Sequence, residues 1–291
     1  MKKQWILPLT AVLGGVAAFI LRLLQRHTGF ESDTGLPIPG NPAGILLVVL
    51  LAALAVVLIL LARQLPKETE SGPPFPDVFT TNDAKLFTLP VMGVFFIALS
   101  GLADLYEGFG MGSLLLQIAA AGDGSGTLAS SLRVVAPGFS AKAQILMAIL
   151  SIASAAGLFV NLLACRRRDG VPVSSANGNL LLIPSVSLVV RLVLTYRIDS
   201  VDPTLTAYYV ELLALVFLCL GFYRLSSFAF RAGRTRLFAL YSGAAVILCI
   251  TALADGSPYL SSILIYIGGA LTLLGFLLLR LAFQPADGQD D

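Results

Sequence analysis

The sequence predicts an all-α fold, a polytopic membrane protein with eight transmembrane helices. Hydrophobic residues make up 57% of the 291 residues and charged residues only 12%, whereas about 25% of the residues in a soluble domain are charged. The mean hydropathy is +0.87, and the apolar residues gather in runs of about 20, the length that a helix needs to cross a bilayer. These observations exclude an ordinary soluble globular protein.

The eight apolar runs are separated by stretches that contain charged residues, glycine or proline. The fifth run is the shortest and contains Pro184 and Arg191, but the orientation of its neighbours requires that it crosses the membrane. Proline is tolerated in membrane helices, because neighbouring helices satisfy the freed backbone groups. The predicted spans are residues 5–24, 43–62, 86–106, 144–165, 180–196, 204–223, 237–254 and 259–279.

The basic residues predict the orientation of these spans. Cytoplasmic loops of membrane proteins carry an excess of Lys and Arg, and most of the 19 basic residues fall on the side of the N-terminus when the spans alternate in direction. We therefore expect both termini in the cytoplasm. The basic residues on that side are Lys2, Lys3, Arg63, Lys67, Lys85, Arg166, Arg167, Arg168, Arg224, Arg231, Arg234, Arg236 and Arg280.

Matched residues in the two halves predict an internal duplication. The segments 85–89 and 236–240 begin the third and seventh spans, and 102–104 and 253–255 end them, all at one offset of 151 residues. Each half holds four spans, an even number, so both enter the membrane in the same direction. The sequence therefore predicts two parallel four-helix repeats.

The predicted domains follow from this duplication. The first four-span repeat covers 1–165, the second covers 166–283, and an acidic cytoplasmic tail covers 284–291. Two insertions interrupt the first repeat. Residues 68–83 are rich in proline and polar residues, as is typical of a flexible inner linker. Residues 108–142 form an outer segment, in which 108–122 is either a re-entrant or interfacial helix or a covering loop.

Charged residues within or beside the spans are the candidate binding residues. A charge in hydrocarbon costs at least about 2.5 kcal/mol, so it usually faces a partner or a watery cavity. We expect Arg191 to pair with Glu211 at the same depth on the next span, and Asp104 and Asp255 to approach Arg22 and Arg191. One hypothesis is a polar vestibule that opens outward; the alternative is that these charges snorkel, cap helices or are solvated.

Other site chemistries find no support in the sequence. His27 is the single histidine, and the 3 cysteines follow no disulfide or ligand pattern, so we expect no metal site and no cofactor. The triplet Asp33-Thr34-Gly35 occurs once, whereas aspartic proteases need two carboxylates. No nucleophile and base pair indicates an enzyme, and the basic loops form no stripe for nucleic acid.

The outer loop Glu31-Ser32-Asp33-Thr34-Gly35-Leu36-Pro37-Ile38-Pro39-Gly40 resembles loops in uncharacterised multi-pass membrane proteins of Gram-positive, clostridia-like bacteria. The resemblance covers mainly the first 45 residues. It implies a location in a bacterial plasma membrane and implies no activity, substrate or functional residue.

Two hypotheses for function follow. The first is a transporter or permease-like protein for a small polar or anionic solute, in which Arg22 and Arg191 are anion-binding or gating charges. The second is a non-transporting scaffold or regulatory subunit, in which the charges hold helices together and the inner loops bind lipid or a membrane protein partner. In both, the lipid bilayer is the surrounding solvent.

Overall fold

The computed structural model describes residues 5–31, 36–65, 75–80, 84–110, 140–168, 171–172, 177–199, 205–257 and 259–282. In these residues, eight helical segments are long and apolar enough to cross a membrane, which confirms the all-α polytopic fold. The helices are α1 (Ile6–Thr28), α2 (Pro42–Arg63), α3 (Ala84–Gly108), α6 (Ala141–Cys165), α7 (Ile183–Asp199), α8 (Leu205–Ser227), α9 (Thr235–Ala252) and α10 (Leu260–Ala282).

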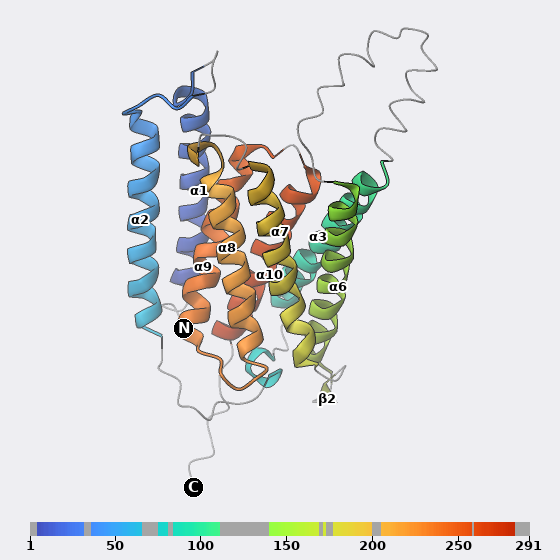
Figure 1. Ribbon diagram of the computed structural model, residues 1–291. Helices are drawn as coiled ribbons and strands as arrows, with labels where there is room; N and C mark the ends of the chain where they lie inside the picture. The colour runs from blue at the N-terminus through green and yellow to red at the C-terminus, as the bar shows by residue number, and fades with distance from the viewer. Residues whose placement is uncertain are drawn as a thin grey trace.

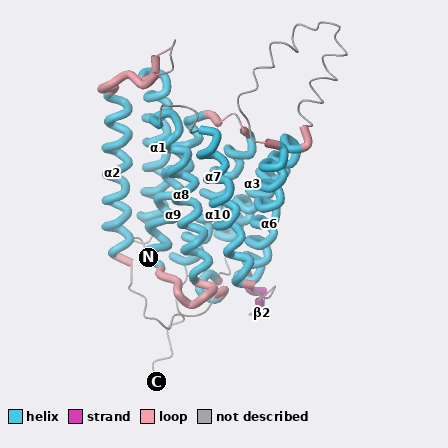
Figure 2. Tube along the Cα trace, viewed as in Figure 1, coloured by secondary structure: helices cyan, strands magenta, loops and turns pink. Residues whose placement is uncertain are grey.

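Short elements lie next to the ends of the long helices, which are drawn in cyan in Figure 2. The 3-10 helix η2 (Gly178–Leu182) precedes α7 and extends the shortest predicted span, whereas η3 (Leu253–Asp255) follows α9. A third 3-10 helix, η1 (Asp77–Phe79), precedes α3, and the two-residue strands β1 (Arg167–Arg168) and β2 (Val171–Pro172) pair antiparallel after α6. All eight predicted spans therefore correspond to observed helices.

Capping residues define where two of the helices begin. Asn41 Oδ1 accepts hydrogen bonds from the backbone N–H groups of Ala43 and Gly44, at 2.8 and 3.4 Å, with Pro42 at the first position of α2. Ser140 Oγ accepts from the N–H of Ala143 at 3.4 Å at the start of α6. These bonds satisfy N–H groups that have no partner within the helix.

Six of the helices labelled in Figure 1 form a closed ring by their contacts, in the order α9, α8, α7, α6, α3 and α10. Each packs against its two neighbours in this order, and α10 also contacts α8. Helix α1 packs against α9 from outside the ring, and α2 lies at the periphery against α1. Only 17% of the most apolar window of α2 is buried, compared with 67% for α9 and α10. Helices α1 and α2 thus present their outer faces to lipid.

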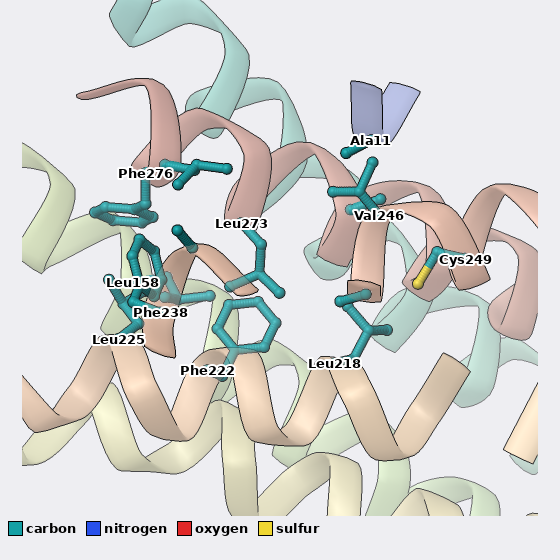
Figure 3. Close-up of a cluster of buried hydrophobic side chains, with 14 of the residues drawn as sticks. Ala11, Leu158, Leu218, Phe222, Leu225, Phe238, Val246, Cys249, Leu273 and Phe276 are labelled. Atoms are coloured by element: carbon teal, nitrogen blue, oxygen red, sulfur yellow. The ribbon is translucent and has the colours of Figure 1, made fainter. Parts of the chain in front are cut away.

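The core lies between α8, α9 and α10 (Figure 3), where Phe222, Leu218 and Leu273 interdigitate. Small residues let α3 and α10 approach closely. A Cβ atom on Gly93 would come within 2.5 Å of the backbone nitrogen of Thr272, and one on Gly268 would come within 2.8 Å of the carbonyl oxygen of Gly93. Only glycine permits this contact.

The inner segment 68–83 contains an ordered plug, so the prediction of a flexible linker is wrong for its described part, residues 75–80. Phe79 is fully buried and contacts the rings of Phe228, Phe238 and Phe276 edge to face, at centroid distances of 5.2, 6.1 and 5.5 Å. Edge-to-face aromatic pairs are stabilising beyond the area they bury. This segment therefore packs into the end of the bundle at which α8 and α10 end.

The packing of the two halves does not follow one symmetric arrangement. Helix α3 packs along α10, whereas α9 and α6, their counterparts in the predicted repeat, do not pack along each other in the described chain. The duplication stays a prediction from the sequence. The predicted tail 284–291 and residues 111–139 of the outer segment lie outside the described residues.

Candidate functional site

The first buried charge pair joins α1 to η3. Arg22 Nε donates to Asp255 Oδ1 at 2.6 Å, and the side chains are 0% and 5% exposed. Arg22 Nη1 donates to Gln25 Oε1 at 2.8 Å, and the guanidinium lies over the ring of Tyr209 with its carbon 5.2 Å from the centroid. Three kinds of contact thus compensate for the removal of this charge from water.

Helical spacing and a tight turn build this pair. Gln25 and Arg26 follow Arg22 by three and four residues, so all three lie on one face of α1. Gly256 adopts φ +61°, a left-handed conformation that favours glycine, and it ends η3 directly after Asp255. Arg26, whose side chain is 46% exposed, adds a contact of 3.7 Å to Asp255 Oδ1 and donates to the Asp255 carbonyl oxygen.

The second buried charge pair joins α7 to α3. Arg191 Nη2 donates to Asp104 Oδ2, and the side chains are 2% and 1% exposed. Ser100, one turn before Asp104, lies 3.5 Å from the same Nη2 and donates its own hydroxyl to the carbonyl oxygen of Ser261 at 2.9 Å. Arg191 Nη1 is buried and has no hydrogen-bond partner among the described residues.

Glu211 lies on α8 and contacts α10, which corrects the predicted pairing with Arg191. Its Oε1 accepts a hydrogen bond of 2.7 Å from Oη of the buried Tyr266. The contacts of Arg191 in the described chain are instead to Asp104 and Ser100. Consecutive helices α7 and α8 do pack together, but Arg191 is directed toward α3.

Among the described residues, several carboxyl side chains lie around Arg191. Asp104 is in direct contact, Glu107 is close enough to interact electrostatically with both Asp104 and Arg191, and Tyr266 interacts with both Glu211 and Arg191. Glu107 also accepts from Gln144 Nε2 at 3.2 Å. We call Arg191, Asp104, Ser100, Glu211 and Tyr266, contributed by α3, α7, α8 and α10, the ring cluster.

Both charge pairs lie in the same half of the bundle, because α1, α3 and α7 run in the same direction and end there (Figure 1). At about 1.5 Å per residue, Arg191 lies roughly 12 Å from the end of α7 and Asp104 about 6 Å from the end of α3. Charges at this depth in hydrocarbon need partners. The structure provides one Asp for each of the two arginines.

The five predicted binding residues thus separate into two groups. Arg22 and Asp255 form a pair outside the ring, whereas Arg191, Asp104 and Glu211 belong to the ring cluster. The two pairs occupy equivalent positions in the predicted repeat, and each joins an arginine of one half to an aspartate of the other. The sequence thus correctly indicated that these aspartates approach these arginines.

Sequence reasoning missed Gln25, Ser100 and Tyr266. Gln25 had a usable signal, since a residue three positions after a buried arginine lies beside it on a helix. Ser100 had a similar signal, because it lies one turn before Asp104. Tyr266 had none, since its partner Glu211 lies on a different helix, far away in the chain.

Comparison with known proteins gave no match. No family model matches the chain, and no curated protein and no solved structure is significantly similar to it. Among the described residues, no group of three or more His, Cys, Asp and Glu side chains is arranged to hold a metal ion.

Proposed function

We propose that the chain is a transporter or permease-like protein that handles a small polar or anionic solute at the ring cluster. The observation that carries the proposal is Arg191 Nη1, a charged donor that is buried and without an acceptor among the described residues. A buried unsatisfied donor costs about 1 to 3 kcal/mol, and more when it is charged. A carboxylate or another acceptor on a solute removes this cost by binding there.

The neighbouring carboxylates refine the kind of solute. Glu107 and Glu211 add negative charge around the Arg191 to Asp104 pair. These carboxylates repel a solute that carries only hydrogen-bond acceptors. A solute that also carries a hydrogen-bond donor, such as a zwitterion, complements both kinds of group. Sites between the helices of a bundle commonly combine apolar walls with a few polar groups of this kind.

The pair of Arg22 and Asp255 can be compared with the pair of Arg191 and Asp104. Arg22 has Asp255, Gln25 and the Tyr209 ring as partners, and it lies outside the six-helix ring. We assign this pair to holding α1 against the end of α9. The location that we propose is a bacterial plasma membrane with both termini in the cytoplasm, which rests on the basic residues and on the loop resemblance.

A scaffold or regulatory subunit is the second candidate function. The observation that favours it is the exposed apolar surface of α1 and α2, which includes Leu13, Ile20, Ile45 and Val49 with 60, 60, 59 and 57% of their surface exposed. Lipid covers such a surface, and so does a membrane protein partner. In this account both arginine pairs only hold helices together.

Thermal unfolding of the detergent-purified protein separates the two candidates. The probes are chloride, acetate, phosphate and glycine, and the matched variants are Arg191→Gln with Asp104→Asn and Arg22→Gln with Asp255→Asn. A ligand at 100 times its Kd stabilises the native state by about 2.7 kcal/mol. We expect a probe to stabilise the wild type and the Arg22 variant but not the Arg191 variant.

Two results would contradict the transporter proposal. The first is a stabilisation that both double variants lose equally, because that places binding elsewhere. The second is the absence of any shift together with a second membrane protein that co-purifies in a fixed ratio, which supports the scaffold.

A further inference from the structure

The opposite end of the bundle carries an arginine between two aromatic rings. The Arg224 guanidinium, in the last turn of α8, lies 5.7 Å from the ring centroid of Tyr223 and 5.6 Å from that of Tyr241 on α9. Arg224 Nε is buried and has no hydrogen-bond partner among the described residues. The rings therefore fix the position of the guanidinium. Arg224 is partly exposed, so an external acceptor can reach the side chain from outside the bundle.

The charges of the described residues at this end of the bundle favour an anion. In the described part of this end, Asp77 is the one carboxylate side chain. The described basic side chains there are Arg63, Lys85, Arg166, Arg224, Arg231, Arg234, Arg236 and Arg280. Arg236 and Arg280 are held in part by the chain itself, through the Leu65 carbonyl oxygen and the Thr235 hydroxyl.

We propose that Arg224, Tyr223 and Tyr241 form a binding site for the phosphate of an anionic phospholipid headgroup. The planar guanidinium suits two-point hydrogen bonding to phosphate oxygens. Tyr223, whose ring lies against the Arg224 guanidinium, is 51% exposed, and Phe230 at the same end is 52% exposed. Apolar surface for acyl chains is therefore available at this end of the bundle. Aromatic residues at this level are typical of the membrane interface. The site does not depend on the proposed transport function.

Native mass spectrometry of the detergent-purified protein tests this site. The probes are phosphatidylglycerol, the zwitterionic phosphatidylcholine and inorganic phosphate. We expect phosphatidylglycerol to bind in preference to phosphatidylcholine, and the variant Arg224→Gln to weaken its binding about tenfold, the loss of one charge-assisted hydrogen bond. The control variant Arg231→Gln removes an exposed charge at the same end and should weaken binding less than about twofold.

A second variant keeps the test valid if Arg224→Gln does not fold. Arg224→Lys retains the charge but loses the planar pair of donors, and we expect it to weaken phosphatidylglycerol binding by about threefold. Equal loss in the Arg224 and Arg231 variants, or equal binding of the two lipids, would overturn the proposal. Binding of inorganic phosphate as strong as that of phosphatidylglycerol would also overturn it, because the site would then take the free anion.

Discussion

Removal of the Asp255 carboxylate charge is expected to destabilise the bundle by about 3 to 5 kcal/mol. In Asp255→Leu, the Arg22 guanidinium stays at 0% exposure without its negative partner, and breaking one side of a buried ion pair leaves an uncompensated charge. Gln25 and the Tyr209 ring remain, but neither carries a negative charge. Arg22→Met should also destabilise the bundle but cost less, because the buried Asp255 carboxylate keeps the contact of 3.7 Å with Arg26.

Replacement of both partners is expected to restore most of this stability. In Arg22→Met with Asp255→Leu, no buried charge remains, and such exchanges are often neutral or stabilising. We expect the double variant within about 1 kcal/mol of the wild type. The control Arg26→Met should cost less than about 1 kcal/mol, because this side chain is 46% exposed.

Unfolding by sodium dodecyl sulfate in mixed micelles, followed by circular dichroism, measures all four variants. A double variant as unstable as the sum of its two single variants would refute the reasoning, because the two charges would then act independently. So would an Arg22→Met variant with wild-type stability.

Three further changes test the packing. Phe79→Ala should cost about 3 to 5 kcal/mol in the same unfolding assay. An equal cost for Phe230→Ala, which changes an exposed side chain, would contradict the burial of Phe79 at the end of the bundle. Gly93→Ala should cost about 1 to 3 kcal/mol by overpacking against the backbone of α10. Gly44→Ala should be milder, because its Cβ atom would meet side-chain atoms of Gln25 and no backbone atom closer than these. Equal costs would argue against close packing of α3 and α10. Asn161→Leu should cost about 1 to 3 kcal/mol, because the buried Asn161 amide accepts from the N–H of Asn177 and donates to its carbonyl oxygen. An Asn161→Leu variant with wild-type stability would show that these hydrogen bonds do not hold η2 in place.

The sequence predicted the spans well, because bilayer thickness fixes helix length and leaves a strong pattern of hydropathy. It did not predict the order of the helices. The rule that consecutive elements pack together holds for α1 with α2 and for α7 with α8, but α3 packs along α10. That contact depends on Gly93 and Gly268, and glycine is too common in this chain to identify one contact in advance.

The candidate site was predicted in part for a related reason. Depth in the membrane can be counted along a helix, so Asp104 and Asp255 were correctly placed near the arginines. The direction of a side chain around the helix is not fixed by depth, and Arg191 reaches Asp104 instead of Glu211. Phe79 was missed because the prolines of its segment indicated a linker, although Phe75, Val78 and Phe79 gave that segment an apolar face.

We propose that the two arginine pairs have different roles, one structural and one in solute binding. The most direct test records solute-driven currents or uptake in liposomes that contain the purified protein, with acetate, phosphate and glycine as probes. We predict transport of a probe by the wild type and by Arg22→Met with Asp255→Leu, and its loss in Arg191→Met with Asp104→Leu. Equal transport by the two double variants, or no transport of any probe by the folded wild type, would contradict the claim.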